Sequence, residues 1–465
     1  MIGIIGIVLA LALLMALAYR GVSVLILAPL MALLAVLFSP GTPLLASYTQ
    51  VFMPALGGFV IAFFPLFLLG AVFGKLMEAS GAALVIARGI VQRLGEQRAI
   101  LAIVLACAVL TYGGVSLFVV AFAVYPIAAA LFRQAQVPKR LIPGAIALGA
   151  FTFTMTALPG TPAIQNAIPM PYFGTTPFAA PGLGVIGGAI MLGLGMWWLS
   201  RRAAAAARAG EGYGAHDEDL PAPAPDAPAA DRAAFWRALA PVGLVIALNY
   251  VLATWLLPAL DTGYLAEPRY GNTSITAVRG IWAVIVALAA AIVLLIALQR
   301  QRLTQLTRTL EQGAAGSVLP LMNTASQVGF GAVIASLAGF ALLRDAVLGI
   351  APGNPLVSMS IAVNILAGIT GSASGGMSIA LQTLGETWLA MGQAAGIAPD
   401  LLHRVTAIAT GGLDALPHNG AVITLLSICG LTHRQSYLDI FVVAVAIPLL
   451  ALVAVVVLGT ALGSF

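Results

Sequence analysis

Two short interruptions stand at matching places in the two halves of an otherwise apolar chain. One reads Asp-Ala-Leu-Pro-His-Asn-Gly from Asp414 to Gly420, and the other reads Thr-Ala-Leu-Pro-Gly-Thr-Pro from Thr156 to Pro162. Inside a lipid bilayer every backbone N–H and C=O needs an internal partner, so irregular backbone occurs only where it faces a protected cavity. Paired broken helices of this kind indicate the binding site of a membrane carrier.

The amino-acid composition also indicates that the chain lies in a lipid bilayer. Hydrophobic residues make up 61% of the chain and charged residues only 8%, whereas a soluble domain has about 25% charged residues. We therefore predict an all-α polytopic membrane protein. The net charge of +5 is assigned to loops that set membrane orientation, not to nucleic-acid binding. Cys107 and Cys429 lie in different apolar runs without ligand-spaced partners, which predicts buried thiols and no metal site.

The apolar runs predict about ten complete crossings of roughly 20 residues and two half-crossings. The first run, residues 2–18, is expected to be an uncleaved span. Short matches recur between the halves in the same order: Gly70 aligns with Gly331 at an offset of 261 residues, and Pro159 aligns with Pro417 at 258. Matches in order at nearly one offset predict an internal duplication.

Basic residues predict how the two repeats are oriented. Arginine and lysine cluster in three places, at residues 88–140, 201–237 and 300–308. Placing all three clusters in the cytoplasm obeys the positive-inside rule and makes the repeats inverted. The first repeat is then 1–200 and the second 236–465, joined by a charged, Ala/Pro-rich cytoplasmic linker at 201–235.

Each repeat is predicted to contain a re-entrant hairpin followed by a broken helix. The hairpins are 99–133 and 360–396, and the broken helices are 141–175 and 400–432. Glycine and small hydroxyl residues at a hairpin tip let the backbone approach a ligand closely. Half-helix N-termini at the two breaks present unpaired N–H groups and partial positive charge, which suit a carboxylate. We therefore expect an anionic substrate.

The two tips and the two breaks are expected to meet near the membrane midplane and form one site. Its predicted substrate-binding residues are Thr111, Tyr112, Gly113, Gly114, Ser116, Gly160, Thr161, Asn166, Thr370, Ser372, Ser374, Gly375, His418 and Asn419. Serine and threonine also form ordinary hydrogen bonds between membrane helices, which is the alternative role for each hydroxyl. Glu386 and His403 are predicted to lie nearer the outer surface, in contact with solvent, and Arg344 and Arg404 are placed on the outer side as exceptions to the charge rule.

Asp414 and His418 are the predicted proton-coupling residues. Acids and histidines inside membrane spans face the protein interior or water, and they are functional candidates by default. Desolvation is expected to move the pKa of an aspartate here toward physiological pH, and a histidine already titrates near 6.5. Thr156 and Gly160 stand at the aligned positions of the first half, so only the second half carries this chemistry. A structural contact between the acid and the histidine is the alternative.

Known signatures of enzymes and of ATP-driven pumps are missing from the sequence. It holds no hydrolase triad, Walker loop, dinucleotide fingerprint or metal-ligand cluster, so we expect no cofactor. An intramembrane enzyme that uses Asp414 and His418 as an acid and base pair is the rival function, but a second acid or nucleophile at matching depth is lacking. Accumulation of unchanged substrate in sealed vesicles would separate transport from catalysis.

Nearly the whole chain resembles the gluconate:proton symporter (GntP) family of the ion-transporter superfamily. The resemblance is strongest at residues 110–118, at 156–176 and at Gly-Gly-Leu-Asp-Ala-Leu-Pro-His-Asn-Gly, residues 411–420. It implies proton-coupled uptake of a small hydroxy or sugar acid across the bacterial inner membrane, and these motifs are most similar to permeases described as carrying D-3-hydroxybutyrate. It also implies a homodimer in which a transport unit moves against a scaffold as an elevator.

A sodium-coupled dicarboxylate or citrate carrier of the same architecture is the alternative function. Sodium-coupled relatives in the superfamily carry Ser-Asn-Thr at their hairpin tips. This chain has Tyr-Gly-Gly at residues 112–114 and Ser-Ala-Ser-Gly at 372–375, which argues against sodium. Stimulation of uptake by sodium at fixed pH would distinguish the two carriers.

Overall fold

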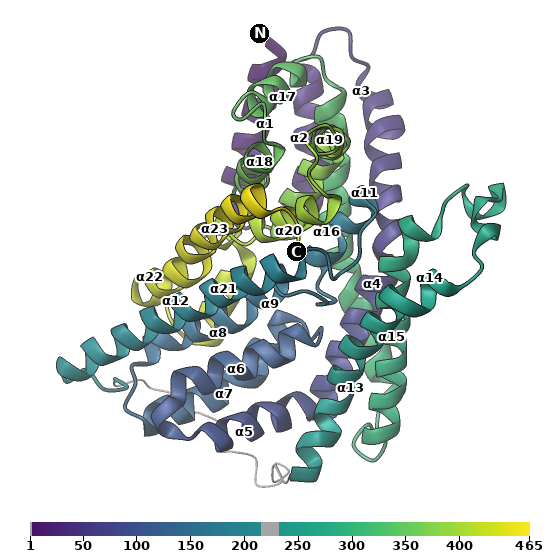
Figure 1. Ribbon diagram of the computed structural model, residues 1–465. Helices are drawn as coiled ribbons and strands as arrows, with labels where there is room; N and C mark the ends of the chain where they lie inside the picture. Colours follow the sequence, from purple (N-terminus) through teal and green to yellow (C-terminus); the bar gives the residue numbers. More distant parts are fainter. Residues whose placement is uncertain (1, 215–231) are drawn as a thin grey trace.

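The computed structural model describes residues 2–214 and 232–465, and all regular structure in these two ranges is helical (Figure 1). The first range contains α1 (Ile2–Tyr19), α2 (Val24–Leu37), α3 (Leu44–Ala46), α4 (Met53–Ala79), α5 (Ala82–Leu94), α6 (Ala99–Tyr112), α7 (Leu117–Gln134), α8 (Ile142–Ala150), α9 (Phe153–Thr156), α10 (Ile164–Ala167), α11 (Pro169–Phe173) and α12 (Pro181–Arg208).

The second range contains α13 (Arg232–Val251), α14 (Leu257–Ala259), α15 (Ile275–Gln299), α16 (Leu306–Ser336), α17 (Phe340–Leu348), α18 (Pro355–Thr370), α19 (Ala373–Ala394), α20 (Pro399–Ala409), α21 (Gly420–Ile428), α22 (His433–Phe441) and α23 (Ile447–Leu462). Short π-helical segments join α3 to α4, α13 to α14 and α22 to α23 into continuous spans.

The described helices confirm an all-α polytopic membrane protein. Seven of them are long and apolar enough to cross a bilayer, and a bent pair formed by α5 and α6 would make eight. Helices α1, α2 and α18 are apolar but shorter. The expected ten crossings are therefore reached only when shorter helices are counted with the long ones.

The same order of elements follows two long helices that pack along one another, α4 and α16. Helix α4 leads into α5, the hairpin α6–α7 and the interrupted segment α8–α11. Helix α16 leads into α17, the hairpin α18–α19 and the interrupted segment α20–α21. In Figure 1, α5 lies at the bottom of the view and α17 at the top, so the two series extend toward opposite ends of the molecule.

Both hairpin tips turn through glycines in the left-handed region. Gly114, two residues after the end of α6, has φ +92°, and Gly371, directly after α18, has φ +60°. A side chain at either position would be strained, because L-residues rarely adopt positive φ. The hairpin 99–133 thus turns at 113–116, and the turn within 360–396 lies at 371–372.

Helix α12 continues to Arg208, beyond the boundary at residue 200 that the sequence suggested for the first half. Its basic residues Arg201 and Arg202 therefore belong to the helix and not to the linker. Helix α13 starts at Arg232, and the central part of the predicted linker, 215–231, lies outside the described residues.

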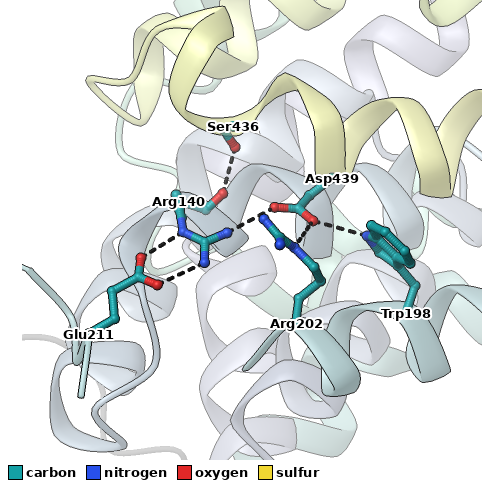
Figure 2. A network of polar contacts seen from close by, with 6 residues as sticks. All are labelled: Arg140, Trp198, Arg202, Glu211, Ser436 and Asp439. Carbon is teal, nitrogen blue, oxygen red and sulfur yellow. Dashed lines mark hydrogen bonds and ion pairs between the residues drawn. The ribbon is translucent and has the colours of Figure 1, made fainter. Parts of the chain in front are cut away.

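A buried carboxylate joins elements from both halves of the chain (Figure 2). Asp439 on α22 is 1% exposed and accepts bonds from Trp198 Nε1 at 2.9 Å and Arg202 Nε at 3.0 Å, both on α12. Arg140 Nη1 lies 3.4 Å from its other oxygen. Arg140 also binds Glu211 through both carboxylate oxygens, which lowers the pKa of Glu211 below its ordinary value. The stability from that outer pair is present above the ordinary carboxyl pKa and is lost as pH falls through the lowered one.

Asp439→Asn is expected to lower the free energy of unfolding by about 3 kcal/mol, because one change leaves two arginines facing a neutral amide. Thermal unfolding of the purified protein in detergent measures the loss. Glu211→Gln removes the exposed partner of the same arginine and should cost less than about 1 kcal/mol. An equal loss of unfolding free energy in both variants would show that Asp439 is not the centre of the network.

Candidate functional site

A cavity of about 750 Å³ lies where both hairpin tips and both helix breaks meet. Its walls come from the α6–α7 and α18–α19 turns, the segments after α9 and α20, and one face each of α4 and α16. This places groups from both halves of the chain around one space. Such a volume accommodates a small organic molecule.

Nine of the predicted binding and coupling residues line this cavity. They are Thr111, Gly114, Ser116, Thr370, Ser372, Ser374, Asp414, His418 and Asn419. The other six are not part of its lining: Tyr112, Gly113, Gly160, Thr161, Asn166 and Gly375.

Most of those six residues hold the cavity wall in place from behind. The Tyr112 hydroxyl donates to Pro159 O at 2.6 Å, which fastens the first tip to the first break. Asn249 on α13 donates to Gly160 O at 3.1 Å. Gly113 lies so close to Val242 that a Cβ there would overlap it. Gly375 lies closer still to Gln327, so at both tips a missing side chain allows helix contact.

The second tip and the second break are joined by hydrogen bonds. Asn419 Nδ2 donates to Gly371 O at 2.9 Å and to Asp414 O at 2.8 Å. Its Oδ1 accepts from Ala421 N and Val422 N, so Asn419 is the N-cap of α21. His418 Nε2 lies 2.9 Å from Gly368 O, and because a carbonyl only accepts, this nitrogen carries the proton. Asn419 therefore orders the backbone of the site besides lining it.

Asp414 lines the cavity on a short 3-10 turn, Leu413–Ala415, between α20 and α21. It forms no ion pair among the residues that the structure describes. The second break is anchored beside it, because Asn364 Oδ1 accepts from Leu413 N at 3.3 Å. Asp414 is thus held at the cavity wall by an anchored backbone.

Asn166 does not face the cavity, which corrects its predicted role. It is fully buried, and its Nδ2 donates to Thr161 O at 3.0 Å and to Pro177 O at 2.9 Å. Its Oδ1 accepts from Arg404 Nη1 at 3.1 Å and lies 3.1 Å from His403 Nε2. Hydrogen bonds between the two broken helices use the donors and the acceptor of the Asn166 amide, so it has little hydrogen-bonding capacity left for a ligand.

The prediction that His403 contacts outer solvent is wrong, because it is 0% exposed, whereas Glu386 is exposed. Arg404 is 0% exposed as well. The Arg404 guanidinium donates to the carbonyls of Ala179 at 2.8 Å, Pro177 at 3.3 Å and Thr156 at 3.4 Å. Among the described residues it has no carboxylate partner. Because Thr156 lines the cavity, this buried cation lies behind the cavity wall, one hydrogen bond from the Thr156 carbonyl.

Sequence reasoning also missed a set of polar residues on uninterrupted helix. They are Asn323, Thr324 and Gln327 of α16, which line the cavity. Gln165 of α10 also lines it, but lies within the first interrupted segment. Polar side chains within an apolar span were the available signal. The strongest sequence signals lie at the helix breaks and hairpin tips, and α16 contains neither a break nor a tip.

Comparisons with known proteins agree with this architecture. No family model matches the chain. It is 49% identical over 447 residues to the uncharacterized transporter YxjC of Bacillus subtilis (strain 168), covering 94% of each protein. The chain belongs to the same transporter family as YxjC. It also resembles the crystal structure of the Alcanivorax borkumensis YdaH transporter, described as having an unusual topology, with a TM-score of 0.56 and 18% identity over 88% of this chain and 87% of that one. The second likeness concerns the fold alone.

Proposed function

We propose that this transporter carries a small hydroxy-carboxylate across the bacterial inner membrane together with protons. One observation carries the proposal: Asp414 and His418 share a cavity with both hairpin tips, and behind its wall lies the buried Arg404, which has no carboxylate partner in the part of the chain that the structure describes. A buried cation favours an anion in the adjoining space. The acid and the histidine supply groups that exchange protons there.

The tip of the second hairpin is the proposed binding position for the substrate's carboxylate. Helix α19 begins at the cavity with Ser372 as its N-cap, and Ser372 Oγ accepts from Gly375 N at 3.2 Å. The N-terminus of this 22-residue helix carries partial positive charge toward the cavity. Ser372 and Ser374 line the same space and add hydroxyl donors.

We further propose inverted repeats that form an elevator within a homodimer, as in the GntP family that the sequence resembles. The transport unit is the pair of hairpins with the pair of broken helices, and α4 and α16 belong to the scaffold. The opposite placement of α5 and α17 in Figure 1 supports inversion. The resemblance favours D-3-hydroxybutyrate or gluconate as substrate.

Uptake into proteoliposomes tests this function. We expect inside-alkaline vesicles to accumulate radiolabelled D-3-hydroxybutyrate or gluconate without sodium, and to release it unchanged when a protonophore collapses the pH gradient. Empty liposomes are the control. Accumulation that requires a sodium gradient at equal pH would instead support the sodium-coupled carrier, and chemical conversion of the acid would support an enzyme.

A further inference from the structure

A polar face interrupts the apolar surface of α16 where that helix borders the cavity. Asn323, Thr324 and Gln327 lie on consecutive turns and all line the cavity. Thr324 is 4% exposed and Gln327 is 2% exposed, so these groups are nearly withdrawn from water. Polar side chains at such depth are costly unless they find partners.

Three amide oxygens at this wall have no such partner. Asn323 Oδ1, Gln327 Oε1 and, from α10, Gln165 Oε1 are buried without a hydrogen bond to any residue that the structure describes. All three residues line the same cavity. Because buried acceptors are normally satisfied, the pattern points to a ligand that donates hydrogen bonds here.

The unpaired oxygens of these amides disfavour the carboxylate end of a substrate and fit a hydroxyl. A carboxylate only accepts hydrogen bonds, so it repels carbonyl oxygens. A hydroxyl both donates and accepts, and it therefore pairs with a primary amide in either orientation of that amide. We infer that Asn323 and Gln327, with Thr324, form the subsite for the substrate's hydroxyl group. This inference rests on the proposed transport of a hydroxy-carboxylate.

The subsite adjoins the proposed carboxylate position. Thr324 Oγ1 lies 3.3 Å from Ser374 Oγ in the first turn of α19. Gly375, one residue further on, is so close to Gln327 Oε1 that any Cβ would overlap it. A short acid with its hydroxyl a few bonds from the carboxyl group would thus contact α19 and α16 at once. Closure of the second tip on α16 then depends on both ends of the molecule.

The first half offers no equivalent subsite. At the repeat offset of 261 residues, the α4 positions that correspond to Asn323, Thr324 and Gln327 are Ala62, Phe63 and Leu66. Leu66 also lines the cavity, on a helix that packs along α16. The residue that α4 supplies to the cavity at these positions is therefore apolar, which suits the hydrocarbon part of a small acid.

Paired ligands that differ only in the hydroxyl test this assignment. Binding of D-3-hydroxybutyrate and butyrate, and of lactate and propionate, is measured by calorimetry on the purified wild type and on Gln327→Leu. We expect the wild type to favour each hydroxy acid by roughly tenfold or more, and Gln327→Leu to reduce that preference to about threefold or less while keeping the affinity for butyrate. Gln382→Leu makes the same chemical change outside the cavity and should keep the wild-type preference.

Asn323→Leu provides a second test should Gln327→Leu fail to fold, because Asn323 does not contact Gly375 in the tip. An equal loss of affinity for both members of a pair would overturn the hydroxyl assignment, since it indicates a role in tip closure alone. A wild type that binds butyrate as tightly as its hydroxylated partner would also overturn it, while leaving carboxylate transport intact. A wild type that binds none of the four acids would refute the proposed function, and the hydroxyl subsite with it.

Discussion

Asp414→Asn is expected to abolish accumulation driven by a pH gradient and to retain exchange of substrate across the membrane. The amide has the size of the protonated carboxyl and cannot release a proton, so anion binding no longer depends on protonation. One pH unit corresponds to about 1.4 kcal/mol per proton, or roughly tenfold accumulation for a one-to-one symporter. The variant should fall to an inside-to-outside ratio of about one.

Two proteoliposome assays measure this difference: net uptake under an imposed pH gradient, and counterflow of labelled against unlabelled substrate at equal pH. Glu386→Gln neutralises an exposed acid on α19 and should behave as the wild type. His418→Gln separates the two coupling candidates. Should Asp414→Asn and His418→Gln both still concentrate substrate when only a proton gradient is imposed, neither residue couples transport to protons.

Arg404→Met is expected to be the most destabilising single change at the site. It removes the guanidinium that donates to three backbone carbonyls and to Asn166 Oδ1, all within buried structure between the two breaks. Each buried acceptor left without a donor costs about 1–3 kcal/mol, so the total loss should exceed about 3 kcal/mol. Thermal unfolding in detergent measures it.

Arg404→Lys distinguishes the charge of this residue from its geometry. Lysine keeps the cation but lacks the planar fork, so we expect it to recover part of the anion affinity and only part of the stability. Arg344→Met removes an exposed arginine next to Asp345 and should change stability by less than about 0.5 kcal/mol. Wild-type anion affinity in a folded Arg404→Met would show that the buried cation does not favour the substrate.

The helical membrane fold followed from the sequence because its causes are local. Apolar composition, span length and the need to satisfy backbone groups in lipid leave little choice of architecture. The interruptions at Pro159 and Pro417 could also be predicted from the sequence, since proline and glycine within an apolar run indicate irregular backbone. Inversion of the repeats, the elevator motion and the homodimer stay predictions.

The side chains that line the cavity were harder to identify from the sequence, because the direction in which each side chain points depends on packing between distant segments. Asn166 and Asn419 occur at comparable breaks, yet the first is taken up by Arg404 and the second borders the cavity. Gln327 becomes part of the cavity wall only because a glycine of α19 allows close contact. No local sequence pattern in α10, α16 or α20 predicts which of these contacts forms.

The charges of Arg404 and Asp414 also bear on how membrane voltage acts on the proposed cycle. With Asp414 ionised and the cavity empty, the charges of Arg404 and Asp414 cancel within the transport unit. With Asp414 protonated and a monocarboxylate bound, the substrate's charge takes the place of the aspartate's, and the sum is again zero. Moving one net charge through the field would involve about 2.3 kcal/mol per 100 mV. One proton carried with one monocarboxylate transfers no net charge per cycle, so under the proposed function the direction of transport depends on the concentrations of acid and proton alone.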